Sequence, residues 1–135
     1  MHSFLFVYGT LRTDMNHEMA HYLRNQSRVL GQGFLYGKLY NVGNYPGLKL
    51  GGDGKVFGDV LELTSPSESL RKLDIYEGIG MEIDQPFEYS RLVANVFFEQ
   101  QQIECWTYRY NFPVDETDLI VSGDYLEFFK QKFSP

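Results

Sequence analysis

Phe4-Leu5-Phe6-Val7-Tyr8, followed by Gly9, is the stretch of sequence that constrains the fold most. β-branched and aromatic residues dominate it, which is typical of a β-strand. Its apolar side chains fall on both faces, because successive residues of a strand point to opposite sides. We therefore expect a short strand at the centre of a sheet, ending at the glycine.

Four further segments have the composition of strands and lie between turn-forming residues. They are 29–42, 56–63, 87–98 and 103–110. Glycines within the first of them predict bends or bulges. Turns are expected at 43–47 and 99–102, and Gly51-Gly52-Asp53-Gly54 is expected to form a hairpin tip.

Three helices complete the expected set of elements. They span 16–26, 66–76 and 125–132. The first is weakly amphipathic, with Asn16 or Asp14 as its N-cap. Ser65-Pro66-Ser67-Glu68 has the pattern of a capping box and predicts the start of the second helix. That helix is expected to end near Gly78 or Gly80.

The composition predicts a single domain over residues 1–135. The chain has 135 residues, which is enough for one hydrophobic core and too few for two. Twelve Lys and Arg against 18 Asp and Glu give a net charge of −6, which excludes nucleic acid and anionic membrane surfaces as partners. The apolar run 4–8 is far too short for a signal peptide or a membrane span.

Cysteine and histidine usage favours a reducing, cytoplasmic setting without a metal site. Cys105 is the one cysteine of the chain, and its place beside Trp106 in a strand indicates a core residue. His17 and His21 are spaced to meet on one helix face, but no third ligand is indicated. We expect these two histidines to face solvent.

The loop after the opening strand, residues 8–12, is the first candidate site. Backbone N–H groups beyond the end of a buried strand can form a nest for a carboxylate or an oxyanion. The alternative is an ordinary turn in which Gly9 supplies the backbone dihedrals. Taken alone, the loop favours the ordinary turn.

Glu77 is the second candidate. It follows Leu73 by four residues and Leu70 by seven, which places its carboxylate on the apolar face of the predicted helix. Burial there would raise its pKa towards neutrality, as a general base that later acts as an acid requires. Alternatively, Glu77 lies in a fraying last turn and faces solvent. Its position leaves both interpretations open.

Polar residues inside strands are the third candidate set. Tyr89 and Arg91 share a strand face and could line a pocket together. Solvated or cross-strand positions are the commoner outcome for such residues, and we expect one of these for Arg109.

Motifs that follow one another along nearly the whole chain point to a family. They are Phe6-Val7-Tyr8-Gly9-Thr10-Leu11-Arg12, Gly37-Lys38-Leu39-Tyr40, Tyr45-Pro46, Val56-Phe57-Gly58-Asp59-Val60, Leu73-Asp74-Ile75-Tyr76-Glu77-Gly78, Tyr89-Ser90-Arg91, Cys105-Trp106-Thr107-Tyr108 and Ser122-Gly123-Asp124-Tyr125. With them the chain resembles the gamma-glutamylcyclotransferase-like proteins, in particular the small branch that includes gamma-glutamylamine cyclotransferase and bacterial relatives.

The resemblance implies an α+β fold, a small mixed β-barrel with a few short helices and a cavity for a gamma-glutamyl group. It implies that Glu77 is the acid and base of the reaction. It also implies substrate contacts from Tyr8, Gly9, Thr10, Leu11, Pro46, Tyr89 and Arg91. Members of this family release 5-oxoproline and a free amine or amino acid, without a metal or organic cofactor.

The residues of the chain suit that chemistry. The substrate's own α-amine attacks its γ-carbonyl, so the nucleophile is tethered and no Ser or Cys triad is needed. Two departures from the family pattern bear on substrate choice. Tyr89 follows Glu77 by 12 positions, with the acidic residues Glu82, Asp84 and Glu88 between them, and Thr10 stands where many relatives carry Ser.

Two alternatives to an enzyme stay open at this point. A binding module of the same fold could keep the cavity without turnover, because a fold does not guarantee an activity. A small interaction protein could instead use its acidic surface to meet a partner.

Overall fold

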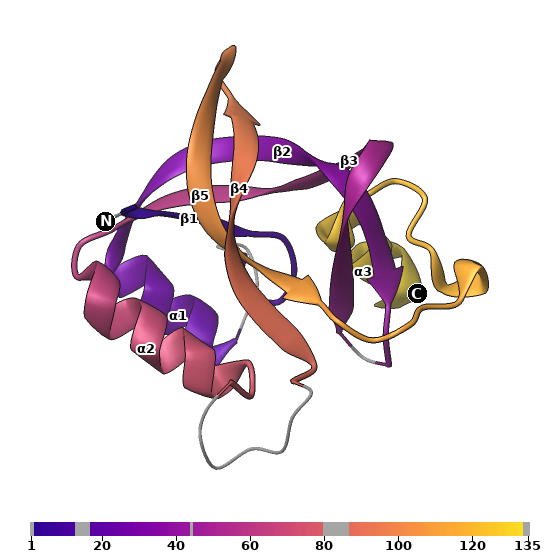
Figure 1. Cartoon of the computed structure of the whole chain (residues 1–135), viewed down its shortest axis with the longest axis horizontal. Coiled ribbons are helices and arrows are strands. Elements are labelled where there is room, and N and C mark those ends of the chain that lie inside the picture. Colours follow the sequence, from indigo (N-terminus) through magenta and orange to yellow (C-terminus); the bar gives the residue numbers. More distant parts are fainter. Residues whose placement is uncertain (1, 13–16, 44, 80–86, 134–135) are drawn as a thin grey trace.

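The structure is a computed structural model of the chain, and it describes residues 2–12, 17–43, 45–79 and 87–133. Five strands close into a barrel in the order β1-β3-β2-β4-β5 (Figure 1). The strands are β1 (Phe4–Val7), β2 (Ser27–Asn41), β3 (Pro46–Leu63), β4 (Tyr89–Phe98) and β5 (Gln101–Tyr110). The helices are α1 (Glu18–Asn25), α2 (Pro66–Tyr76), α3 (Tyr125–Phe133) and the 3-10 turn η1 (Glu116–Asp118). The expected α+β fold with a small barrel and short helices is confirmed.

The opening strand β1 has a hydrogen-bonded neighbour on each side, as its sequence predicts. It pairs antiparallel with β3 and parallel with β5, where Leu5 lies opposite Trp106. Leu5, Phe6 and Val7 are all buried, so both faces of the strand are covered. The single parallel pairing makes the sheet mixed.

The hairpin of β2 and β3 is longer than expected, and the predicted tip at 51–54 is wrong. The two strands pair from Ser27 opposite Leu63 to Asn41 opposite Pro46. The register steps from Tyr36–Lys55 to Gly37–Leu50, so residues 51–54 form a bulge inside β3. Gly-Gly-Asp-Gly has turn composition, but here its two positive-φ glycines bend a continuous strand. The turn of the hairpin lies between Asn41 and Pro46, where the turn at 43–47 is expected.

The hairpin of β4 and β5 is confirmed, with a tighter turn than predicted. Only Glu99 and Gln100 separate the strands, and both have positive φ, at 48° and 64°. Cys105 is buried in β5, as expected, and burial raises the pKa of its thiol to about 12. Arg109 is exposed, also as expected.

The helix α2 has the predicted bounds but lacks the predicted capping box. The Ser65 side chain makes no capping hydrogen bond, and the Glu68 carboxylate lies 3.7 Å from Lys72 Nζ. The Ser65 carbonyl accepts the Ser69 N–H at 3.0 Å, which still starts the helix. Gly78, with φ 78°, follows its end.

The helix α1 begins at Glu18 and is capped by His17. The proposed caps Asn16 and Asp14 lie outside the described residues. His17 Nδ1 accepts the Met19 N–H at 3.2 Å, and its Nε2 lies 2.9 Å from the Tyr76 hydroxyl at the end of α2. The expectation that both histidines face solvent is therefore wrong for His17, because its two ring nitrogens contact the Met19 N–H and the Tyr76 hydroxyl. None of the described helices is long and apolar enough to cross a membrane.

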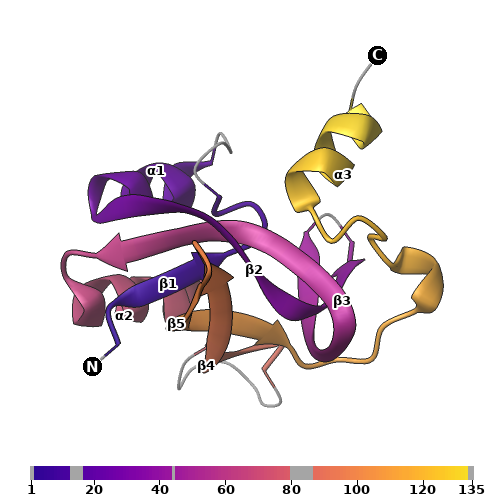
Figure 2. The same ribbon diagram turned by 90° about the horizontal axis from the view of Figure 1, so that it is seen from above.

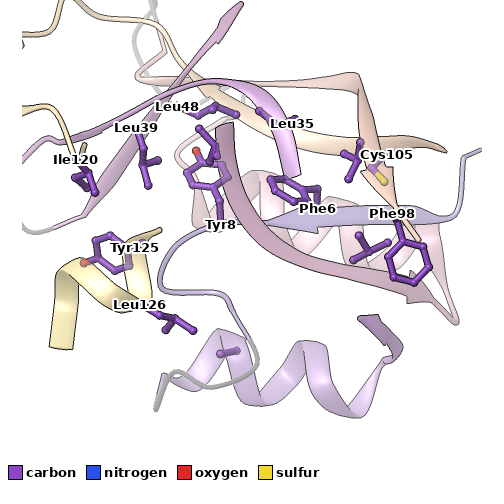
Figure 3. Close-up of a cluster of buried hydrophobic side chains, with 14 residues drawn as sticks. Phe6, Tyr8, Leu35, Leu39, Leu48, Phe98, Cys105, Ile120, Tyr125 and Leu126 are labelled. Atoms are coloured by element: carbon purple, nitrogen blue, oxygen red, sulfur yellow. The ribbon is translucent and has the colours of Figure 1, made fainter. Parts of the chain in front are cut away.

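Two apolar clusters lie on opposite faces of β1. Phe6 belongs to the first cluster, which takes residues from all five strands and from α3 (Figure 3). Leu5 and Val7 belong to the second, which includes Leu23 of α1 and Leu73 of α2. Figures 1 and 2 accordingly show α1 and α2 on the same side of the barrel, with α3 at its other end. The second cluster fixes the end of α2 against the strand that leads to the candidate loop.

Gly123, just before α3, is expected to be intolerant of a side chain. Its φ is 69°, and a Cβ there would lie 1.9 Å from the Lys55 carbonyl oxygen. Gly78 has a similar φ of 78° with nothing within 4 Å of such a Cβ, so it is a matched control. We expect Gly78→Ala to cost about 1 kcal/mol of unfolding free energy and Gly123→Ala about 2 kcal/mol or more, in urea titrations. Equal losses would contradict the packing argument.

Candidate active site

A cavity of about 340 Å³ lies beside the end of β1. Residues 8–11, directly after this strand, form part of its lining. Phe6 and Val7 of β1 also line it. The rest of the lining comes from segments far apart in sequence, namely Tyr45-Pro46 before and in β3, Tyr76-Glu77 at the end of α2, Glu88-Tyr89 at the start of β4, and Tyr108 of β5. The barrel therefore gathers the predicted loop and the predicted glutamate around one space.

The loop after β1 is held by two hydrogen bonds to backbone carbonyls. The Tyr8 hydroxyl donates to the Tyr108 carbonyl at 2.7 Å, and the Arg12 N–H donates to the Gly9 carbonyl at 3.0 Å. A Cβ on Gly9 would lie 2.3 Å from Pro46 Cγ, while the φ of Gly9 is outside the left-handed region. Gly9 is thus needed for close approach to Pro46, and the expectation that it supplies special dihedrals is wrong.

Glu77 is the C-cap residue of α2, and its half-buried side chain lines the cavity. Its N–H donates to the Leu73 carbonyl at 2.8 Å, which fixes the backbone. Burial, together with the nearby negative charges of Glu88 and Asp74, raises the pKa of the Glu77 carboxyl from 4.5 to about 7. A carboxyl with this pKa can both take up and release a proton at neutral pH.

Three buried tyrosines, Tyr8, Tyr89 and Tyr108, line the deeper part of the site. The Tyr89 hydroxyl donates to the Pro46 carbonyl at 2.8 Å, and the Tyr108 hydroxyl donates to Asp74 Oδ1 at 2.7 Å. Burial raises the pKa of all three phenols, so they stay neutral. The hydroxyls therefore brace the walls of the cavity.

Arg91 is the one predicted substrate contact that does not line the cavity. Its Nε donates to Asp74 Oδ1 at 2.8 Å and its Nη2 to Asp74 Oδ2 at 3.2 Å. Its guanidinium also lies 4.4 Å from the ring centre of Trp106. Arg91 is thus connected to the cavity through Asp74, which also accepts a hydrogen bond from the Tyr108 hydroxyl.

Glu88 and Tyr45 also line the cavity, although neither is among the predicted substrate contacts. The Tyr45 hydroxyl donates to the Glu88 carboxylate, and this bond, together with burial and the negative charges nearby, raises the pKa of Tyr45 to about 12. The Glu88 backbone carbonyl accepts the Asn111 N–H at 2.8 Å, which fixes the residue at the start of β4. The sequence signal for Glu88 is its place one residue before Tyr89, a predicted substrate contact.

The chain matches known proteins over most of its length. A family model described as "Gamma-glutamyl cyclotransferase, AIG2-like" matches residues 5–127. The chain belongs to this family. The gamma-glutamylcyclotransferase family protein YtfP of Escherichia coli K12 is 32% identical over 124 residues, which cover 91% of this chain and 96% of that protein.

Solved structures of similar proteins have the same fold. YkqA from Bacillus subtilis aligns with a TM-score of 0.75 and 28% identity over 100% of this chain. This chain spans only 44% of the YkqA chain. An AIG2-like protein of Mus musculus aligns with a TM-score of 0.70 and 24% identity, covering 91% of this chain and 87% of that one. The AIG2-like fold is therefore shared across bacteria and a mammal.

In this family member, the buried side chain of Arg12, which is 1% exposed, also holds the loop after β1 in place. Its Nη1 lies 2.9 Å from Asp124 Oδ1, and its Nη2 lies 3.5 Å from Asp59 Oδ1. The Thr10 side chain makes a hydrogen bond to the Tyr76 hydroxyl, which joins the loop to the end of α2. Among the described residues, no group of three or more His, Cys, Asp or Glu is placed to hold a metal ion.

Proposed function

We propose that this chain is a gamma-glutamylcyclotransferase that converts a gamma-glutamyl amine or gamma-glutamyl amino acid to 5-oxoproline and a free amine. The observation that carries the proposal is the carboxyl of Glu77, which has a pKa near 7 and lines a cavity beside the loop after β1. Family membership supports the reaction class.

The chemistry needs little more than proton transfer and orientation. The substrate's α-nitrogen loses a proton, attacks the γ-carbonyl carbon and forms the ring C–N bond. The γ-amide C–N bond then breaks, and the electron pair leaves with the amine nitrogen. In all, the α-nitrogen gives up two protons and the departing amine gains two. Glu77 takes one proton from the attacking nitrogen and returns one to the leaving nitrogen.

We assign the loop of residues 9–11 to binding the charged groups of the γ-glutamyl moiety. Its backbone N–H groups would hold the substrate's carboxylate or the oxyanion of the tetrahedral intermediate. The close contact between Gly9 and Pro46 supports this role because it fixes the loop at the cavity. Tyr8, Leu11 and Tyr89 would shape the space around the glutamyl chain.

Arg91 is proposed as a positioning residue. Its two hydrogen bonds to Asp74 hold a carboxylate that accepts Tyr108 and raises the pKa of Glu77. No cofactor is required for the proposed step, since the nucleophile belongs to the substrate. A cytoplasmic location is proposed because the single cysteine is buried and unpaired.

The pH dependence of kcat/KM is expected to report the ionisation of Glu77. Activity should rise with pH through a midpoint near 7, because the base must be deprotonated to accept a proton. Glu88→Gln should move this midpoint to lower pH, since the Glu88 charge raises the pKa of Glu77. Rates measured from pH 5 to 9 would show both effects. A midpoint near 4.5 in the wild-type protein would contradict the assignment.

The proposed function itself is tested by product analysis. Purified protein would be incubated with gamma-glutamyl dipeptides, gamma-glutamyl-ε-lysine and glutathione, and the products would be quantified by mass spectrometry. Equimolar 5-oxoproline and free amine from at least one donor is the expected result. Binding of a donor without any product would indicate a binding module instead.

A further inference from the structure

We infer that the preferred donor carries a cationic nitrogen on its leaving group, and that Glu88 binds this nitrogen. The inference rests on the proposed function, because it concerns the part of the substrate beyond the scissile amide. It starts from Glu88, Tyr45 and Tyr76 in the cavity lining, to which the proposed reaction gives no direct role.

The described lining is acidic and has no cationic side chain. Its charged residues are Glu77 and Glu88. The arginines that approach the site are engaged elsewhere, Arg12 with Asp59 and Asp124, and Arg91 with Asp74. A second carboxylate on the substrate would meet like charge here, whereas an ammonium group would meet opposite charge.

The tyrosines of the lining suit an ammonium group as well. Tyr45 and Tyr76 are 39% and 41% exposed, so they mark the outer part of the cavity. The rings of Tyr45 and Tyr89 lie 6.3 Å apart, centre to centre, and both residues line the cavity with Glu88. Aromatic faces beside a carboxylate are a favourable environment for a desolvated cation.

The position of Glu88 assigns it to the leaving group. The γ-glutamyl group must place its α-nitrogen at Glu77 and its charges at the loop after β1, so these contacts use the inner part of the site. Glu88 is bonded to the half-exposed Tyr45, which places it on the outward path that the departing amine must take. The hydrogen bond from Tyr45 and the Asn111 contact hold Glu88 in place before substrate arrives.

The test uses three donors of equal length that differ only at the far end of the leaving group. Their leaving amines are 1,5-diaminopentane, n-hexylamine and 6-aminohexanoate, which end in an ammonium, a methyl and a carboxylate. Affinity is measured by titration calorimetry with the Glu77→Gln protein, so that turnover does not interfere. We expect the ammonium donor to bind about tenfold more tightly than the methyl donor, and the carboxylate donor to bind most weakly.

Adding Glu88→Gln to this background should remove the preference for the ammonium donor. Tyr45→Phe should weaken the preference, because Glu88 loses the hydrogen bond that holds it. Glu104→Gln removes the same charge from an exposed position of β5 outside the lining and should leave the preference unchanged. Binding of the methyl donor by each variant confirms that the cavity is intact.

Several results would overturn the inference. They are equal or tighter binding of the methyl donor, a preference that survives Glu88→Gln, and failure of all three donors to bind. Release of 5-oxoproline by the wild-type protein is measured separately with the same donors. Release without preference would refute the inference and leave the proposed function standing. Selective binding without release would refute the function and leave the role of Glu88 standing.

Discussion

Glu77→Gln is expected to lower the rate of 5-oxoproline release by about 10²- to 10⁴-fold. The amide keeps the size of the side chain at the end of α2, but it can neither accept nor return a proton. Substrate binding should change far less than kcat, because the loop after β1 and the tyrosine walls remain. Single-turnover rates with wild-type and variant protein under saturating donor would measure the loss. A variant with more than half of the wild-type rate would exclude Glu77 as the base.

A stability measurement separates loss of the base from loss of the fold. The folded-state pKa of Glu77, about 7, is above its unfolded value near 4.5, so wild-type stability falls as pH rises between these values. Glutamine cannot ionise and escapes this cost. Between pH 4 and pH 8, the unfolding free energy of Glu77→Gln should therefore rise by about 1–2 kcal/mol relative to that of the wild type. Partial solvent access to the side chain limits this difference. An inactive variant that is less stable at pH 8 would point to damage instead.

Arg12→Met is expected to destabilise the protein by about 3–5 kcal/mol. The methionine keeps much of the side-chain length but removes a buried guanidinium from Asp59, which is 4% exposed, and from Asp124. The loop after β1 would lose its tie to the segment before α3. Urea unfolding at pH 7 measures the effect.

Arg28→Met is the matched control for Arg12. Arg28 Nη2 lies 2.7 Å from Glu62 Oε1, a shorter contact than those of Arg12, but the two side chains are 72% and 38% exposed. An exposed pair contributes little, so the expected loss is less than about 1 kcal/mol. Similar losses for the two variants would show that burial of the Arg12 pair does not matter.

Local patterns predicted the elements whose determinants are close together in sequence. The run Phe4–Tyr8 gave β1 a buried place with neighbours on both sides, and the spacing around Leu70 and Leu73 gave α2 its bounds. Both elements are confirmed because tertiary packing agrees with local preference there. For Glu77 the same spacing left two directions open, towards the apolar face or towards solvent, and only the closed barrel brings its side chain into the cavity lining.

Features that depend on long-range pairing could not be predicted. Gly51-Gly52-Asp53-Gly54 has the composition of a tip, and only the pairing of β3 with β2 shows that it is a bulge. The partner of Arg12 is Asp124, 112 positions away, and no local pattern joins them. Glu88 was missed for the same reason, because Tyr45 and Glu77 meet it only when the barrel closes.

The most direct test of the account is to follow the oxygen atoms when the protein acts on a gamma-glutamyl donor in water enriched in ¹⁸O. Intramolecular attack by the α-amine involves no water, so we expect 5-oxoproline of natural mass together with the free amine. Attack by water would instead give glutamate carrying ¹⁸O in its side-chain carboxylate. Unlabelled 5-oxoproline from the wild-type protein, released at least about a hundredfold more slowly by Glu77→Gln, is the predicted result. Labelled glutamate, or no product from any donor, would contradict it.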